Sequence, residues 1–406
     1  MVDLSINFAG LELRNPLVVA SCENVRDIRQ IRKAEKCGAA AVILKAMGPP
    51  GSVLLHSKLR TFIDVRGQAI FGGGGSTWLS YDEGAELVKV AKKETGIKIG
   101  VNMPFPMSGE YRHVVDAVNR VTQAGADFIE LNFKGTAFTG GRTKEEVSGE
   151  KSYQHEGALE YGEHMRKYLS RISEGTRTIK KNVDVPVIGK IDPQMADVVA
   201  SALAMESGGA DAVDAANIMG GSIAIDIFNG GRLKMPGARK AILTTVGAPC
   251  KPFAQGFVAR IAKAVNIPIL GSGGLMNWQD AVEMMMFGAT TVSFCTLLFI
   301  QGFEAITEIE SNLRSFMERQ GYTRIDDFIG ISLDYIMSEF RLGEMIPSVA
   351  VIDQKKCIGC GICLKPAHCL AIKMEQGQVM IDEAECLGCG ICTLICPEGA
   401  FSMREI

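Results

Sequence analysis

The sequence lacks any apolar run long enough to cross a bilayer. One of its longest, TTVSFCTLLFI at residues 290–300, falls well short of the about eighteen residues that a membrane helix needs. The N-terminal segment, MVDLSINFAGLELRNPL, carries an acidic residue at position 3 and no basic stretch, so it does not resemble a secretory signal peptide. Both absences predict a soluble, cytoplasmic protein.

An excess of one charge is also absent. The 43 basic and 46 acidic residues leave a net charge of −3 over 406 residues. No basic face indicates nucleic-acid binding. The length is sufficient for one large domain of about 345 residues followed by an appendage of about 60 residues.

Cysteine, by contrast, is abundant and is concentrated near the C-terminus. The segment CIGCGICLKPAHC (357–369) has C-x2-C-x2-C spacing and a fourth cysteine, and CLGCGICTLICP (386–397) repeats the pattern. Thiolates at this spacing bind iron–sulfur cubes, and in two-cluster ferredoxins the fourth cysteine of each run ligates the other cluster. The predicted ligands of one 4Fe–4S cluster are Cys357, Cys360, Cys363 and Cys396, and those of the second are Cys386, Cys389, Cys392 and Cys369.

Structural zinc and disulfides are the alternatives for these cysteines. Zinc sites rarely show three cysteines at x2-x2 spacing, twice, with a closing Cys-Pro. Disulfides would need an export signal. Iron–sulfur clusters of this kind are usually oxygen-sensitive, so we expect an anaerobic or microaerobic host.

The rest of the chain alternates short apolar runs with amphipathic stretches. The eight apolar runs are continuous, as in strands that are buried on both faces. They span residues 16–21, 41–46, 97–102, 127–132, 186–191, 212–217, 267–272 and 291–295. The amphipathic stretches include residues 82–95, 111–124, 157–181, 195–207 and 252–265. Eight βα units predict a TIM (β/α)8 barrel over residues 1–345, followed by a ferredoxin-like α+β domain over residues 346–406. A doubly wound sheet is the alternative.

Polar residues stand at the C-terminal ends of several predicted strands, where TIM barrels hold their active sites. They are Ser21, Lys45, Asn132, Lys190 and Asn217. Such groups are costly inside a barrel mouth unless something satisfies them. They could satisfy one another, but the convergence of five on one rim favours a bound ligand.

A glycine-rich loop, GSGG at residues 271–274, follows the seventh strand, and Cys295-Thr296 ends the eighth. The loops after these strands hold phosphate in many TIM barrels. A flavin mononucleotide fits, with its phosphate at Gly273, Gly274 and Thr296. A nicotinamide cofactor fits less well, because no strand is followed by G-x-G-x-x-G.

Two long insertions flank the mouth, at residues 47–81 and 133–156. Long loops on the catalytic face are candidate lids, and a subunit contact is the alternative. The glycine run 72–75 lacks the Lys-Ser/Thr of a phosphate loop and is interpreted as a mobile segment.

The sequence resembles the FMN/iron–sulfur subunits of bacterial NAD-dependent dihydropyrimidine dehydrogenases, and its barrel is similar to class 1 dihydroorotate dehydrogenases. The resemblance runs from LSINFAGLELRNPLVVAS through VILKAMG, GADFIELNF, PVIGKIDP, GSGGL and GATTVSF to the cysteine motifs. It implies that flavin-site or substrate-site residues are Ala20, Ser21, Lys45, Asn132, Lys190, Asn217, Gly273, Gly274 and Thr296, beside Cys295. It also implies that electrons from NAD(P)H enter at an FAD-bearing partner and pass through the clusters to FMN, which reduces uracil or thymine.

One departure from this pattern concerns the proton donor. The family motif Asn-x-Ser-Cys-Pro, with a catalytic cysteine, is here Asn132-Phe133-Lys134-Gly135-Thr136, so Gly135 stands at the cysteine position. A polar contact is also replaced by Ile218. The candidate replacements for the acid are Lys134, Thr136 and the insertion residues Glu145, Glu146, Tyr153 and His155. Lys134 is the first choice, although it could instead be solvated or face a phosphate.

Two functions therefore remain open. The first is an FMN-dependent oxidoreductase that acts on an activated C=C or C=N bond and is supplied by an FAD/NAD(P)H-binding reductase or a ferredoxin. The second is an electron-transfer subunit whose barrel has lost its substrate chemistry. The resemblance also implies a homodimer or a hetero-oligomer. A ferredoxin-tailed module without flavin is the third alternative.

Overall fold

The computed structural model describes residues 2–52, 61–65, 69–73, 78–107, 110–133, 158–194, 196–215, 219–222, 224–234, 243–336 and 346–406. The chain divides into two units, Met1–Ser338 and Glu339–Ile406. The domain boundary predicted between residues 345 and 346 falls at the edge of a segment outside the described residues, and it stays a prediction.

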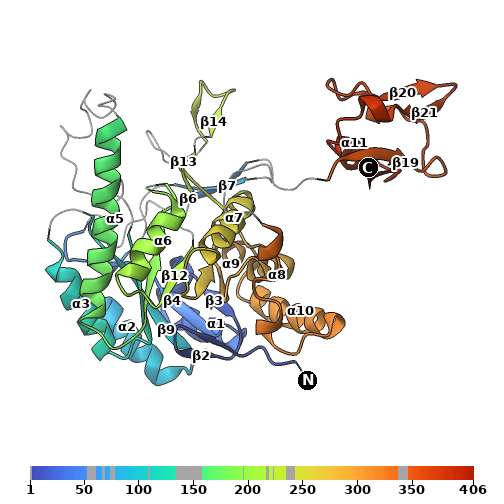
Figure 1. The fold of residues 1–406 in the computed structure, drawn as a ribbon. Coiled ribbons are helices and arrows are strands. Elements are labelled where there is room, and N and C mark those ends of the chain that lie inside the picture. The colour runs from blue at the N-terminus through green and yellow to red at the C-terminus, as the bar shows by residue number, and fades with distance from the viewer. Residues whose placement is uncertain are drawn as a thin grey trace. The chain divides into compact units, whose positions relative to one another are not determined.

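The first unit is built on a closed barrel of parallel strands (Figure 1). In chain order its strands are β3 (Leu17–Val19), β4 (Ala41–Leu44), β9 (Lys98–Pro104), β10 (Phe128–Asn132), β11 (Val187–Lys190), β12 (Ala212–Asp214), β17 (Ile269–Gly271) and β18 (Thr291–Phe294). Each coincides with one predicted apolar run. The pairing of β18 with β3 closes the ring. The predicted TIM barrel is therefore confirmed, and the doubly wound alternative is wrong.

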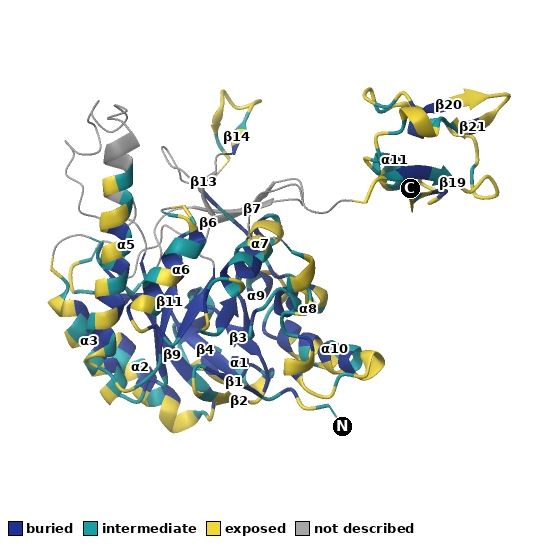
Figure 2. Cartoon of the chain, viewed as in Figure 1, coloured by how far each residue is buried: buried dark blue, intermediate teal, exposed yellow. Residues whose placement is uncertain are grey.

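Helices surround the barrel, and Figure 2 shows the strands inside them as the most deeply buried elements. The helices are α1 (Ile28–Lys36), α2 (Tyr81–Glu94), α3 (Arg112–Gln123), α5 (Ala158–Lys180), α6 (Val198–Ser207), α7 (Lys251–Ala262), α8 (Trp278–Met286), α9 (Thr296–Gln301) and α10 (Glu304–Gln320). The start of α2 is fixed by a capping box, in which the Glu83 amide donates to Ser80 Oγ and the Ser80 amide donates to the Glu83 carboxylate. The N-terminal hairpin β1 (Ile6–Phe8) and β2 (Leu11–Leu13) precedes the barrel.

A second sheet joins the insertions that follow two barrel strands. Its strands are β6 (Thr61–Val65), β7 (Ala69–Gly73), β16 (Leu243–Val246) and β13 (Met219–Ser222), and the short strands β5 (Met47–Gly48) and β8 (Leu79–Ser80) pair nearby. Gly72 and Gly73 pair within this sheet, so the interpretation of residues 72–75 as a mobile segment is wrong for these two glycines. The remaining two glycines lie outside the described residues.

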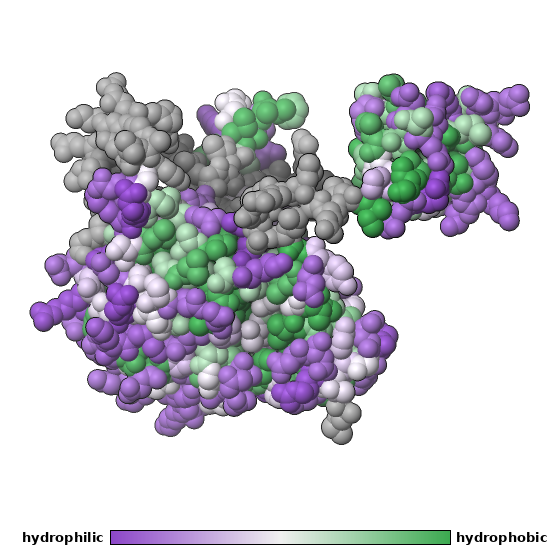
Figure 3. Space-filling model, viewed as in Figure 1, coloured by the Kyte–Doolittle hydropathy of each residue, from purple (hydrophilic) through white to green (hydrophobic). Residues whose placement is uncertain are grey.

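A small hairpin also projects from the insertion after β12. It consists of β14 (Ile225–Asp226) and β15 (Arg232–Leu233), and Figure 3 shows apolar surface on it. Ile227 and Phe228, at its turn, are strongly exposed.

The second unit contains two small antiparallel ladders. Strand β19 (Ser348–Ile352) pairs with β22 (Phe401–Glu405), and β20 (Ile372–Glu375) pairs with β21 (Gln378–Ile381). Helix α11 (Ile391–Ile395) follows the third cysteine motif position of the second run. Its small core combines Val379 and Phe401 with several of the motif cysteines. This is the predicted ferredoxin-like arrangement.

Among the described residues, no helix combines the length and hydrophobicity that crossing a membrane requires.

Close packing inside the barrel makes a testable prediction. A Cβ atom added at Gly100 in β9 would lie 2.2 Å from the ring of Phe128, whereas one added at Gly256, on the exposed side of α7, meets no atom within 4 Å. Gly100→Ala should lower the free energy of unfolding by about 1–3 kcal/mol through overpacking. Gly256→Ala should raise it by about 0.5–1 kcal/mol through helix propensity. Thermal unfolding at one scan rate checks both; an unchanged midpoint for Gly100→Ala would contradict the packing argument.

Candidate functional site

A buried charged cluster occupies the interior of the barrel near the C-terminal ends of its strands. Lys190 Nζ lies 3.2 Å from Glu130 Oε1 and 2.5 Å from Asp214 Oδ2. Both carboxylates are fully buried, and Lys190 is 8% exposed. Three neighbouring strands supply the cluster, because Lys190 is in register with Asp214 on β12 and with Asn132 on β10.

Two neutral side chains extend this cluster around the barrel. Asn102 on β9 donates to Glu130, and Ser272, just after β17, donates to Asp214. Polar groups from five consecutive strands therefore form one hydrogen-bonded network. Sequence reasoning identified only Lys190 in it. Glu130 could have been found, because it precedes Asn132 by two residues and alternate residues of a strand face the same side.

The cluster perturbs its own ionisation. Burial is the largest effect on Glu130 and raises its pKa to about 7; Lys190 opposes the rise, and Asp214 adds to it. Burial alone would lower the pKa of Lys190, but the two carboxylates outweigh it and raise that pKa. Strongly perturbed groups grouped inside a barrel mouth are typical of functional sites.

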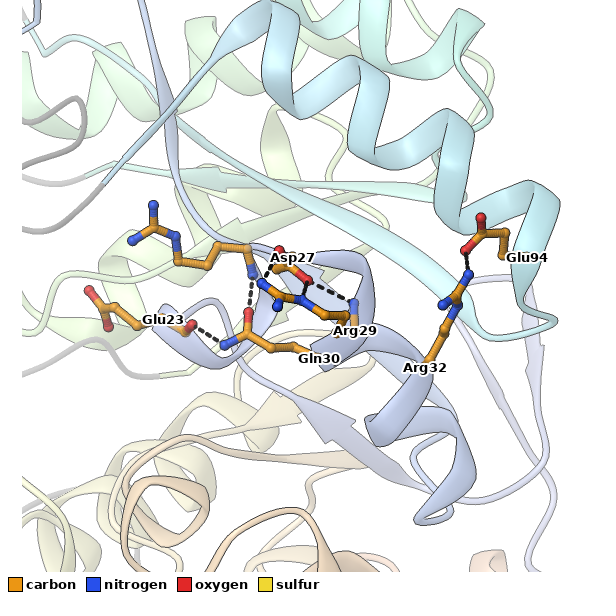
Figure 4. Close-up of polar contacts among 7 residues, drawn as sticks. Glu23, Asp27, Arg29, Gln30, Arg32 and Glu94 are labelled. Carbon is orange, nitrogen blue, oxygen red and sulfur yellow. Dashed lines mark hydrogen bonds and ion pairs between the residues drawn. The ribbon is translucent and has the colours of Figure 1, made fainter.

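The second rim lysine has a separate partner. Lys45 Nζ lies 3.1 Å from Glu23 Oε1, and Lys45 is 5% exposed. Glu23 is in the loop after β3, and Gln30 of α1 holds that loop by donating to the Glu23 carbonyl at 2.9 Å (Figure 4). The Arg26 amide donates back to Gln30. The loop therefore presents the Glu23 carboxylate to Lys45.

Residues at the seam between the first and eighth strands lie beside each other. The Ala20 amide donates to the Phe294 carbonyl at 3.0 Å, and Ser21 Oγ donates to the Leu44 carbonyl at 2.9 Å. The Cys22 thiol is a hydrogen-bond neighbour of the Cys295 thiol, and this contact, followed by burial, raises the pKa of Cys22 well above its ordinary value. Ala20, Ser21 and Cys295 thus meet at one place on the rim.

The glycine-rich loop after β17 has the backbone form of an anion cradle. Gly273 and Gly274 have φ values of 108° and 84°, which favour glycine. A Cβ atom on Gly274 would lie 2.6 Å from both the Gly247 carbonyl oxygen and the Lys251 amide nitrogen. Glycine is therefore needed for the close approach of this loop to the start of α7. Thr296 begins α9 at the neighbouring strand end.

Several buried polar atoms of this region have no hydrogen-bond partner among the described residues. They are Asn24 Nδ2, in the loop after β3, Asn102 Oδ1 on β9, and Ser293 Oγ on β18. Buried polar atoms are normally satisfied. These atoms, together with the rim lysines and the glycine cradle, fit a polar ligand such as FMN.

The structure brings together most, but not all, of the predicted site residues. Asn132 is half-buried at the end of β10, and Lys45, Lys190, Gly273, Gly274 and Thr296 stand at strand ends of the same face. Asn217 and the three catalytic candidates, Lys134, Thr136 and His155, lie outside the described residues.

The eight tail cysteines line two cavities. One cavity is lined by Cys357, Cys360, Cys363 and Cys396, with no cysteine from the core of the second motif. The other is lined by Cys386, Cys389, Cys392 and Cys369, with Cys363 at its margin. In each set the fourth cysteine comes from the opposite motif, which is the crossed arrangement of two-cluster ferredoxins.

The surroundings of the sulfur atoms fit iron–sulfur clusters. The Ala350 amide donates to Cys386 Sγ at 3.4 Å, and the Ala400 amide donates to Cys396 Sγ at 3.3 Å. Burial, and then the nearby thiolates of its own set, raise the pKa of Cys363. Bound iron would neutralise that repulsion. No group of three His, Cys, Asp or Glu side chains in the described part of the chain converges as a single metal ion would require.

One histidine that sequence reasoning set aside contacts a predicted ligand. His368 Nε2 lies 3.4 Å from Cys389 Sγ, although the two are 21 residues apart. The sequence signal was weak, because His368 has no metal-ligand spacing and acts, at most, beside the sulfur.

Comparison with known proteins agrees with this architecture. Residues 3–317 match the family model described as dihydroorotate dehydrogenase. The chain belongs to the dihydroorotate dehydrogenase family. Residues 379–402 match the model described as a 4Fe-4S binding domain. The chain is thus an oxidoreductase of the dihydroorotate dehydrogenase family with an iron–sulfur motif at its C-terminus.

Named relatives fall into two groups. The catalytic subunit of dihydroorotate dehydrogenase B (NAD(+)) from Pyrococcus horikoshii is 34% identical over 332 residues, covering 81% of this chain and 98% of the relative. The same subunit from Thermococcus kodakarensis is 28% identical over 346 residues, covering 82% and 98%. Subunit PreA of NAD-dependent dihydropyrimidine dehydrogenase from Escherichia coli is 24% identical over 371 residues, covering 89% and 84%. The resemblance inferred from the motifs is therefore confirmed.

The crossed cysteine sets predict the effect of removing one fourth cysteine. Cys396→Ala should lower the iron content of anaerobically purified protein from about eight to about four atoms per chain, because one complete ligand set is lost. Cys250→Ala, which removes a buried thiol of the barrel unit, is the matched control and should leave iron unchanged. Full iron retention in Cys396→Ala would rule out its place in either set.

Proposed function

We propose that the chain is an FMN-dependent oxidoreductase that exchanges electrons with two 4Fe–4S clusters of its own C-terminal unit. Its substrate would carry an activated C=C or C=N bond. The observation that carries the proposal is the presence, in one chain, of a buried lysine-bearing barrel mouth and two separate four-cysteine cavities.

The residues that would hold FMN are those gathered on the mouth. FMN, when bound, can accept electrons singly and deliver them as a pair. The glycine cradle and Thr296 would bind its phosphate, and the two rim lysines would orient and charge-balance the ring. The full proposed set is Ala20, Ser21, Lys45, Asn132, Lys190, Asn217, Gly273, Gly274, Cys295 and Thr296.

The two clusters would be held by the crossed cysteine sets. Their electrons would come from a partner, either an FAD/NAD(P)H-binding reductase or a ferredoxin. The relatives named as a catalytic subunit or as subunit PreA support a partner subunit, since such names imply an assembly. We propose a cytoplasmic homodimer or hetero-oligomer, with the domain boundary between residues 345 and 346.

The substrate is proposed by class only. The relatives' names refer to dihydroorotate and dihydropyrimidines, but Gly135 replaces the acid that the family motif supplies. Lys134, Thr136 or His155 would then provide the proton, and a general acid is worth about 10² to 10⁴ in rate. The same replacement favours the second candidate, an electron-transfer subunit that relays electrons to another enzyme.

Anaerobic stopped-flow mixing separates the two candidates. The flavin of the purified protein is first reduced and then mixed with orotate, uracil, thymine and simple enoyl compounds, and the return of its visible absorbance is followed. The proposal expects fast reoxidation by one small molecule. Reoxidation only by protein electron acceptors would contradict the enzyme and support the relay. Gly135→Cys offers a matched variant, because restoring the thiol should accelerate a pyrimidine reaction if that class is the substrate.

A further inference from the structure

The charges inside the barrel do not balance. Two fully buried carboxylates, Glu130 and Asp214, face one buried ammonium group, Lys190. If all three are ionised, the cluster keeps one uncompensated negative charge. The remaining neighbours are Asn102 on Glu130 and Ser272 on Asp214, and both are neutral donors. A buried unpaired charge is costly, and such a group binds a proton instead.

The carboxyl groups of Glu130 and Asp214 are also hydrogen-bond neighbours of each other. Two carboxylates have no proton to place between them, so this contact requires that one of them is protonated. Carboxyl pairs that share a site behave in this way, because like charges at short distance cannot both persist. The contact and the charge count therefore lead to the same conclusion by independent routes.

We propose that Glu130 and Asp214 share one proton at neutral pH and that this pair is the charge-balancing proton store of the barrel mouth. Lys190 links the store to the mouth, since its ammonium group contacts both carboxyls from the strand end. Nothing else on the elements packed against the pair carries charge among the contacts described here.

The role of the pair toward a flavin rests on the function proposed above, whereas the shared proton does not. Electrons that arrive at a flavin beside Lys190 add negative charge there. The electrons come from the external donor, and the carboxyl pair answers by binding a proton from solvent. Above about pH 7, where the pair has lost its proton, this uptake adds close to one proton per reduced chain.

Infrared spectroscopy tests the shared proton without any cofactor. The wild-type protein at pH 6 should show a carboxylic C=O band that shifts in heavy water and fades near pH 7. The band should be lost in Glu130→Gln. It should also be lost in Asp214→Asn, although Glu130 is still present, because the remaining Lys190–Glu130 pair is balanced. Glu308→Gln, an exposed carboxyl on α10, is the control and should keep the band.

The infrared outcomes decide the proposal in both directions. A band that survives in Asp214→Asn would mean that burial alone protonates Glu130, and would overturn the sharing. A wild-type protein without the band would overturn the proton itself. Circular dichroism confirms that each near-isosteric variant is folded before its spectrum is interpreted.

A second measurement tests the link to the flavin. Proton uptake on anaerobic reduction is followed with a pH-indicator dye at about pH 8 in flavin-loaded protein. The wild type should take up close to one proton more than Glu130→Gln, and equal uptake would overturn the charge-balancing role. If the protein binds no flavin, the function proposed above fails, while the infrared result stands by itself.

Discussion

The structure depends on how charged groups are accommodated inside an apolar barrel. Lys190 is enclosed by strands that are otherwise apolar, and its charge is tolerated only because Glu130 and Asp214 meet it. Removing one partner of a buried ion pair is strongly destabilising, by about 3–5 kcal/mol. Evolution of such a cluster for stability alone is a weak explanation, since apolar side chains of similar size would serve as well. A functional reason is therefore the better account.

The fold places this cluster where chemistry is possible. Parallel strands bring their C-terminal ends to one face, so residues that are distant in sequence converge there. The glycine cradle, Thr296 and the Lys45–Glu23 pair lie at strand ends of the same face. The second unit contributes a different kind of site, in which small loops hold two sets of thiols. One chain thus combines groups suited to two-electron chemistry with groups suited to single-electron transfer.

The sequence predicted the barrel because buried parallel strands read as uninterrupted apolar runs. It predicted the crossed cysteine sets because their spacing is specific. It did not reveal Asp214, whose partner Lys190 is 24 residues away and becomes adjacent only through strand pairing. The sheet of β6, β7, β16 and β13 was missed for the same reason, since it joins segments that are about 170 residues apart through non-local pairing. Gly135 raised a question that the described residues leave as a prediction.

Composition analysis of anaerobically purified protein tests the central claim most directly. The account predicts about eight iron atoms, about eight acid-labile sulfides and about one FMN per chain. Zinc in place of iron, or a barrel that releases no flavin on denaturation, would contradict it.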